Sequence, residues 1–170
     1  WARSYAGWPA VGQAQPNVSH AALARLERAG FGSLLVTQNV DRLHQRAGSS
    51  HVIDLHGRLD QVVCLGCGLK SERARMQERL IEHNASLPEP GALAPDGDAD
   101  VPDEVIDRFT VPACEACGGV LKPDVVFFGD SVPRTTVDAI FSAVDEAGAL
   151  LVIGSSLMVY SGFRFCRHAH

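Results

Sequence analysis

The sequence predicts an α/β fold, an incomplete Rossmann-like parallel sheet that carries one small inserted module. Two observations support this class. Short aliphatic runs such as Leu34-Leu35-Val36 alternate with amphipathic helical segments, which is typical of buried parallel strands covered by helices on both faces. Residues 58–119 interrupt the alternation with short polar stretches that contain four of the five cysteines. The expected domains are therefore a sheet domain from residues 1–57 and 120–170, and a module at 58–119.

The first half of the chain is expected to alternate helix, strand, helix and strand. Asn17 or Ser19 is a suitable N-cap for the first helix, and Gly30 a suitable stop. The further elements predicted here are a strand at 33–37, a short helix at 41–48 closed by Gly48, and a strand at 51–57 ended by Gly57.

The second half repeats this order, with a strand at 124–130, a helix at 132–148 and a strand at 149–156. The inserted module has one predicted helix, at 71–83, and a long loop at 84–103. Its few aliphatic residues predict that it cannot hold itself together by burying an apolar core. The Asp-rich run at 96–107 begins like a calcium loop but has Val101 where glycine is needed, so a solvated loop is expected.

Composition excludes several classes of function. The chain is 46% hydrophobic and 21% charged, as expected for a globular protein, and its formal net charge is -5. It has no Lys/Arg block, so no direct nucleic-acid binding is expected. It has no apolar run near the roughly 20 residues that a membrane span needs, and no secretion signal, so we expect a soluble intracellular protein. A monomer is also expected.

The cysteines predict a metal site. Cys64-x2-Cys67 and Cys114-x2-Cys117 have the spacing at which one tight turn supplies two thiolates to a tetrahedral Zn²⁺. Disulfides or unrelated thiols are the alternative, which an intracellular chain disfavours. Four cysteine ligands leave no position for substrate, so one structural zinc per chain is expected. Cys166 is expected to be a buried apolar residue.

Polar residues follow three of the predicted strands, at the strand ends where open parallel sheets bind ligands. Any one of them has an ordinary structural explanation. Together they bring amides, a carboxylate, an imidazole and hydroxyls to one rim, which suits a cofactor that contains sugar and phosphate. Imidazole exchanges protons near neutral pH. The three groups are Thr37-Gln38-Asn39-Val40-Asp41, His56-Gly57 and Gly154-Ser155-Ser156.

Six motifs in sequence order resemble the sirtuin family of NAD-dependent protein deacylases. The resemblance spans residues 16–160, and the loop LAPDGDAD with the opening WARSYAGWP is most similar to the class II, sirtuin-four-like branch. The six motifs are PNVSHAAL (16–23), TQNVDRLH (37–44), DLHG (54–57), the paired Cys-x2-Cys, LKPDVVFFGD (121–130) and GSSLMVY (154–160).

The resemblance implies a role for each matching residue. His56 is then the catalytic base that takes a proton from a ribose hydroxyl of NAD, and Asn39 the asparagine that orders water and ribose. His44 is assigned to helix packing or capping rather than catalysis. The implied cofactor-binding residues are Gln38, Asn39, Val40, Asp41, Gly154, Ser155 and Ser156, and the implied peptide-binding edge is Val126, Phe127, Gly129 and Asp130.

The implied reaction removes an acyl group from a protein lysine and releases nicotinamide and O-acyl-ADP-ribose. A protein ADP-ribosyltransferase and a non-catalytic, zinc-stabilised binding module are the alternatives. The family's glycine-rich loop and last strand have no counterpart in the sequence, so the chain resembles the middle of a sirtuin and is expected to be poorly active alone. The location implied is cytoplasmic for a bacterial protein and the mitochondrial matrix for a eukaryotic one.

Overall fold

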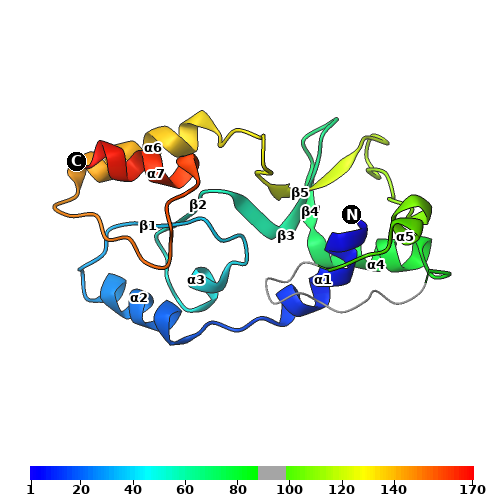
Figure 1. Cartoon of the computed structure of the whole chain (residues 1–170), viewed down its shortest axis with the longest axis horizontal. Coiled ribbons are helices and arrows are strands. Elements are labelled where there is room, and N and C mark those ends of the chain that lie inside the picture. The colour runs from blue at the N-terminus through cyan, green and yellow to red at the C-terminus, as the bar shows by residue number, and fades with distance from the viewer. Residues whose placement is uncertain (88–98) are drawn as a thin grey trace. The chain divides into compact units, whose positions relative to one another are not determined.

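The computed structural model describes residues 1–87 and 99–170 (Figure 1). The chain folds into two compact units. Unit 1 contains Trp1–Ala14 and Arg58–Asp124, and unit 2 contains Gln15–Gly57 and Val125–His170. The predicted loop at 84–103 and the Asp-rich run at 96–107 fall partly on residues 88–98, which lie outside the described residues.

Unit 1 is built on a three-stranded sheet with the strand order β4-β3-β5. β3 and β4 are antiparallel, and Gln61 pairs with Glu72. The sequence predicted the helix at 71–83, which is confirmed as α4, but neither the sheet nor the two other helices. The elements are α1 (Ala2–Gln13), β3 (Gly57–Cys64), β4 (Lys70–Glu72), α4 (Arg73–His83), α5 (Asp103–Arg108) and β5 (Leu121–Val125).

The prediction that the inserted module lacks an apolar core is wrong. Val62 of β3 and Leu80 of α4 are fully buried, and Met76 is 2% exposed. They pack with Cys64, Cys114 and Leu121. The sequence did not reveal this core because its members lie on several separate segments, which only the folded sheet and α4 bring together.

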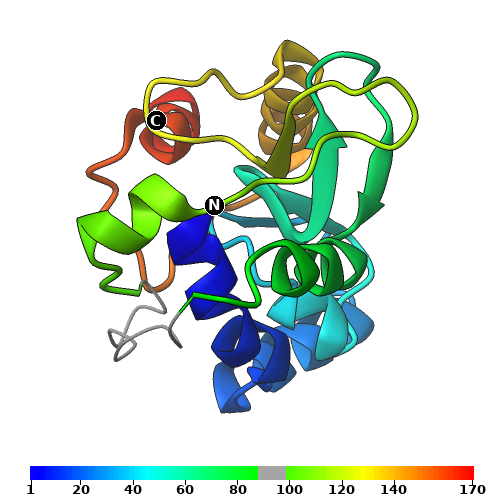
Figure 2. The ribbon, with the colours of Figure 1, turned by 90° about the vertical axis from the view of Figure 1, so that its right-hand side faces the viewer.

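Helix α1 lies beside α4 (Figure 2). The buried guanidinium group of Arg73, on α4, contacts residues of α1 and the preceding Trp1. The Arg73 guanidinium carbon lies 5.3 Å from the ring centroid of Trp1 and 4.8 Å from that of Trp8. Arg73 also donates a hydrogen bond of 3.0 Å to the carbonyl oxygen of Ser4. Burial lowers the pKa of Arg73 to about 10. Cation–π contacts and a backbone acceptor thus replace water around this charge.

Unit 2 contains a two-stranded parallel sheet in which Leu35 pairs with Val52 and Thr37 with Asp54. Of the two predicted N-caps, Asn17 and Ser19, the structure shows Asn17 at this position. Its side-chain oxygen accepts hydrogen bonds from the backbone N–H groups of Ser19 and His20. Predicted helices at 41–48 and 132–148 are confirmed within their bounds. The elements are α2 (Val18–Arg28), β1 (Leu35–Thr37), α3 (Leu43–Arg46), β2 (Val52–Asp54), α6 (Arg134–Glu146) and α7 (Tyr160–His168).

The core of unit 2 is formed by α6, α7 and the residue that follows β2. The two helices lie side by side in Figure 1. Leu55, at the end of β2, is buried there with Val137 and Ile140 of α6 and Phe165 of α7. Rings of Phe141 and Phe165 meet edge to face with centroids 5.1 Å apart. Leu55 thereby ties the carboxyl end of β2 to the two helices.

Two predicted strands of the second half are wrong. Of the segment 124–130 only the first two residues belong to a strand, β5, and 149–156 forms none. Leu151 and Ile153 are 72% and 58% exposed. The aliphatic run was a sound sign of a strand, but a strand needs a neighbour for its backbone hydrogen bonds, and this segment pairs with no strand of the described residues.

Cys166, predicted to be buried, is only half-buried on α7. In the part of the chain that the structure describes, every helix is too short or too polar to cross a membrane.

Candidate functional site

The carboxyl ends of β1 and β2 bring Gln38 and His56 together. Thr37 and Asp54 are paired across the parallel sheet, and the N–H of Leu55 donates a 2.9 Å hydrogen bond to the carbonyl oxygen of Thr37. Gln38 and His56 therefore leave the two strands at the same level. This is the edge at which open parallel sheets bind ligands.

Both ring nitrogens of His56 have hydrogen-bond partners. Nδ1 lies 3.1 Å from the backbone carbonyl oxygen of Gln38, and Nε2 lies 2.7 Å from Oγ of Ser161. A carbonyl oxygen only accepts hydrogen bonds, so Nδ1 carries the hydrogen. In the neutral ring Nε2 is then unprotonated and accepts from the Ser161 hydroxyl. The imidazole is set up as a base at Nε2, facing a hydroxyl group.

The turn after residue 153 contacts Gln38. The side-chain amide of Gln38 donates a 3.0 Å hydrogen bond to Oγ of Ser155, which also accepts from the N–H of Leu157 at 3.1 Å. Gly154 has φ 65, a left-handed value that glycine adopts without strain. Ser156, next in the chain, is exposed. His56, Gln38 and Ser155 thus belong to one connected polar group.

Asn39, Val40 and Asp41 form the turn that leads from β1 into α3. The N–H of Asn39 donates to Oγ1 of Thr37 at 3.1 Å, and the side chain of Asn39 is exposed. The Asp41 carboxylate accepts a 2.9 Å hydrogen bond from the N–H of Leu43 and so caps α3. These residues adjoin the polar group, but their side chains are not part of its hydrogen bonds in this structure.

The turn is fixed by Asp54, two residues before His56. Its carboxylate accepts hydrogen bonds from the Gln45 amide at 3.0 and 3.1 Å and forms an ion pair with Arg42. Arg42 has φ 64, which is unusual for a residue with a side chain. His44 packs on His20 with ring centroids 4.7 Å apart, as predicted for a packing residue. Burial, followed by the charge of His20, lowers the pKa of His44.

The predicted peptide-binding residues lie in a separate turn that begins beside β2. The N–H of Val126 donates to the carbonyl oxygen of His56 at 2.9 Å. Phe127 and Asp130 close the turn, because the N–H of Asp130 donates to the carbonyl oxygen of Phe127 at 2.9 Å. Gly129 has φ 94, and Phe127 is 51% exposed. Val126 thus connects this set to the end of β2.

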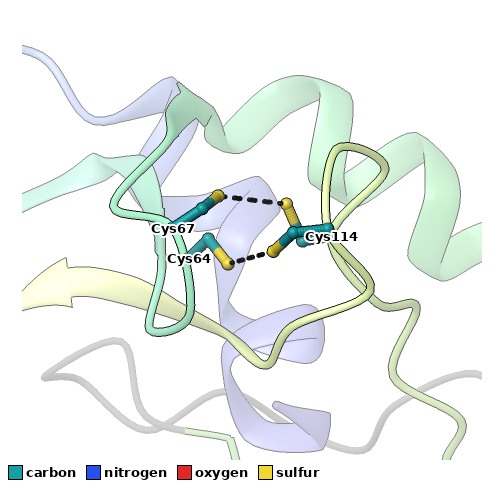
Figure 3. Close-up of side chains that lie close together, drawn as sticks. Cys64, Cys67 and Cys114 are labelled. Atoms are coloured by element: carbon teal, nitrogen blue, oxygen red, sulfur yellow. Dashed lines mark hydrogen bonds between the residues drawn. The ribbon is translucent and has the colours of Figure 1, made fainter.

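The four predicted zinc ligands form one cluster in unit 1 (Figure 3). The sulfur atoms of Cys64 and Cys117 are 3.5 Å apart, those of Cys67 and Cys114 are 3.9 Å apart, and all four lie within 4.8 Å of one another. Sulfurs about 2.3 Å from a tetrahedral Zn²⁺ are about 3.8 Å from each other. The cluster therefore fits a structural zinc with four thiolate ligands.

Backbone geometry prepares these thiols for a metal. Hydrogen bonds from the N–H groups of Cys67 and Gly66 lower the pKa of Cys64 to about 6. The N–H of Gly119 lowers the pKa of Cys117, but the neighbouring Cys64 and Cys67 outweigh it and raise that pKa to about 12. The backbone N–H groups thus favour the thiolate of Cys64, whereas the neighbouring sulfur atoms favour the protonated form of Cys117. A divalent cation removes this repulsion and releases the protons.

The fold and the two sites define the family. A parallel β-pair with a histidine at its carboxyl end, and a cluster of four cysteines that fits zinc, are present in one chain of α/β class. The family model described as the Sir2 family matches residues 1–161. The chain belongs to the Sir2, or sirtuin, family, and the predicted fold class is confirmed. Assignment to the class II branch stays a prediction.

Similar proteins and solved structures agree with the assignment to the Sir2 family. The NAD-dependent protein deacetylase of Xanthomonas campestris pv. campestris (strain 8004) is 58% identical over 170 residues, which cover 99% of this chain and 58% of the relative. NAD-dependent protein deacetylase 2 of Bradyrhizobium diazoefficiens is also 58% identical, with 62% of it covered. A structure titled "Sir2 bound to acetylated peptide" has a TM-score of 0.70 at 30% identity, over 92% of this chain and 55% of that one. The chain spans about 58% of the length of the first of these relatives.

Two residues at the site had no sequence signal. Ser161 and Gly162 lie in the first turn of α7, and no functional motif was predicted beyond Tyr160. An added Cβ at Gly162 would lie 2.9 Å from the side-chain amide carbon of Gln38, so a larger residue there would displace the Gln38 side chain. The contact joins residues more than a hundred positions apart, which no local motif could reveal.

Proposed function

We propose that this chain provides the reaction centre of an NAD-dependent protein lysine deacylase. The observation that carries the proposal is the imidazole of His56, whose Nδ1 is bound to the Gln38 carbonyl and whose Nε2 accepts a hydrogen bond from a hydroxyl. A general base of this reaction must accept a proton from a ribose hydroxyl, which is the same kind of donor.

The residues at the strand ends suit NAD by their chemistry. Gln38, Asn39 and Asp41 offer amide and carboxylate groups for ribose and carboxamide, with Val40 in the same turn, and the group Gly154, Ser155 and Ser156 offers hydroxyls and N–H groups. When bound, NAD supplies the ribose hydroxyls and the nicotinamide leaving group. We assign His56 to proton transfer, Asn39 to orienting water and ribose, and the remaining residues to holding the cofactor.

The partner is an acyl-lysine protein or peptide. A neighbouring structure is titled as bound to an acetylated peptide, and the relatives are named protein deacetylases. We propose that the peptide lies along the turn of Val126, Phe127, Gly129 and Asp130, beginning where Val126 contacts the His56 backbone. The exposed Phe127 ring offers an apolar surface for it. Backbone pairing gives little sequence preference.

The zinc site is assigned a structural role. Four cysteines fill a tetrahedral coordination shell, so no ligand position is left for substrate. Two locations were expected, the bacterial cytoplasm and the mitochondrial matrix, and the bacterial origin of the relatives favours the first. We also propose that the protein is a monomer. The 170-residue chain alone is proposed to be poorly active, since it spans 58% of the length of that relative.

A panel of acylated peptides, incubated with NAD and the full-length protein, tests this function. Mass spectrometry is expected to find peptides that have lost their acyl group, together with O-acyl-ADP-ribose. Peptide or protein that gains ADP-ribose instead indicates the ADP-ribosyltransferase. No consumption of NAD by the zinc-loaded protein with any acyl group would leave the binding module as the better account.

A further inference from the structure

The first turn of α7 contacts the candidate base and its neighbour. Oγ of Ser161 lies 2.7 Å from Nε2 of His56, and Gly162 packs against the side chain of Gln38. Ser161 and His56 are both only half-buried, so water could also have solvated Nε2. The protein instead provides its own hydroxyl at this nitrogen.

The proton positions at His56 leave a single acceptor. Nδ1 donates to the Gln38 carbonyl, so the only lone pair of the neutral ring in its plane is on Nε2. Ser161 uses this lone pair. A second hydroxyl cannot donate to Nε2 at the same time with good geometry.

We propose that Ser161 occupies the base nitrogen of His56 in the free protein and that the substrate ribose hydroxyl displaces it. This inference rests on the proposed function. Ser161 orients the ring and keeps Nε2 facing a hydroxyl until substrate arrives, and it competes with that hydroxyl for the same lone pair. It is a positioning residue, because it acts through His56.

Displacement needs only a local change. A serine hydroxyl moves away from its partner by rotation about χ1, among three staggered positions. The backbone of α7 can stay in place, held by Phe165 in the core of unit 2. The contacts of Gly162 with Gln38 are then preserved while Nε2 is released.

The competition predicts that removing the hydroxyl tightens NAD binding. A typical hydrogen bond contributes a factor of about 2 to 10 to an equilibrium constant. In the full-length protein, Ser161→Ala is expected to lower the Kd for NAD in calorimetry, and the KM for NAD, by about this factor. Ser161→Thr retains a hydroxyl and is expected to behave as the wild type. Ser142→Ala, an exposed serine of α6, is the matched control and is expected to change nothing.

A measurement without NAD separates this inference from the proposed function. Histidine ¹⁵N spectra of the free protein are expected to show His56 with Nδ1 protonated and Nε2 bare, and the Nε2 resonance is expected to move in Ser161→Ala and not in Ser142→Ala. An unmoved resonance overturns the inference. So does a kcat that drops tenfold at unchanged Kd, because Ser161 then relays the proton. If the ¹⁵N result is as expected but the wild type consumes no NAD, the proposed function fails instead.

Discussion

Substituting Arg42 tests how the turn beside His56 is held. Arg42 has φ 64 at the start of α3 and forms an ion pair with Asp54, whose carboxylate also accepts from Gln45. The left-handed backbone costs a residue with a Cβ about 1–2 kcal/mol. The charged hydrogen bond gains about 1.5–3 kcal/mol. Because Arg42 and Asp54 retain 24% and 12% of their side-chain exposure, we take the lower end of that range.

These magnitudes predict an order of stability. Arg42→Ala loses the ion pair and keeps the backbone cost, so its free energy of unfolding falls by about 1.5 kcal/mol. Arg42→Gly loses the same ion pair but relieves the backbone. The greater freedom of glycine in the unfolded chain costs about 0.4–1 kcal/mol, which must be subtracted from this relief. Arg42→Gly is therefore expected to be more stable than Arg42→Ala by about 1 kcal/mol.

Urea unfolding of the zinc-loaded protein, followed by circular dichroism, measures both variants. The control is the same pair of substitutions at Arg46, at the end of α3, where the backbone is helical. There glycine is expected to be less stable than alanine by up to about 1 kcal/mol. An Arg42→Gly variant no more stable than Arg42→Ala, with the Arg46 pair as expected, would refute the reasoning that the left-handed turn is strained.

Two further predictions concern pH and metal. Hydrogen bonds from Ser50, chiefly from its hydroxyl and secondly from its backbone N–H, lower the pKa of Glu27 from an ordinary 4.5 to about 2. The stabilisation by the ionised carboxylate is therefore complete above pH 4.5 and is lost as the pH falls toward 2. Thermal unfolding from pH 6 to pH 3 is expected to show a smaller drop in midpoint for Glu27→Gln than for the wild type, and equal drops would contradict the assignment. Metal analysis is expected to find one zinc per chain. Chelation of that zinc is expected to lower the midpoint of thermal unfolding by at least several degrees, and Cys114→Ser is expected to have the same effect in the presence of metal. A purified protein that is free of zinc and has an unchanged midpoint would argue against a structural metal.

The sequence allowed a good prediction wherever a local rule applies. Asn17 caps α2 because its side chain reaches the N–H groups two and three residues ahead, which any Asn-x-Ser-type start can do. The four cysteines came together as expected, since the Cys-x2-Cys spacing dictates how one turn presents two sulfurs. Gln38 and His56 came together because parallel strands align their carboxyl ends.

The sequence failed where structure depends on distant partners. Residues 149–156 read as a strand from their aliphatic side chains, yet a strand is defined by a neighbour that the segment itself cannot specify. The core of unit 1 was missed because Val62 and Leu80 belong to separate elements, β3 and α4, which only the fold brings together. Ser161 was missed for the same reason, since its contact with His56 crosses most of the chain.

The most direct test of the central claim is His56→Ala in the full-length protein. The variant is expected to fold, to bind NAD, and to lose about 10²- to 10⁴-fold in kcat for deacylation, since a general base contributes a factor of that size. His44→Gln, a half-buried histidine on α3, is the control and is expected to retain activity within a few-fold. A His56→Ala enzyme that deacylates peptide at the wild-type rate would contradict the account.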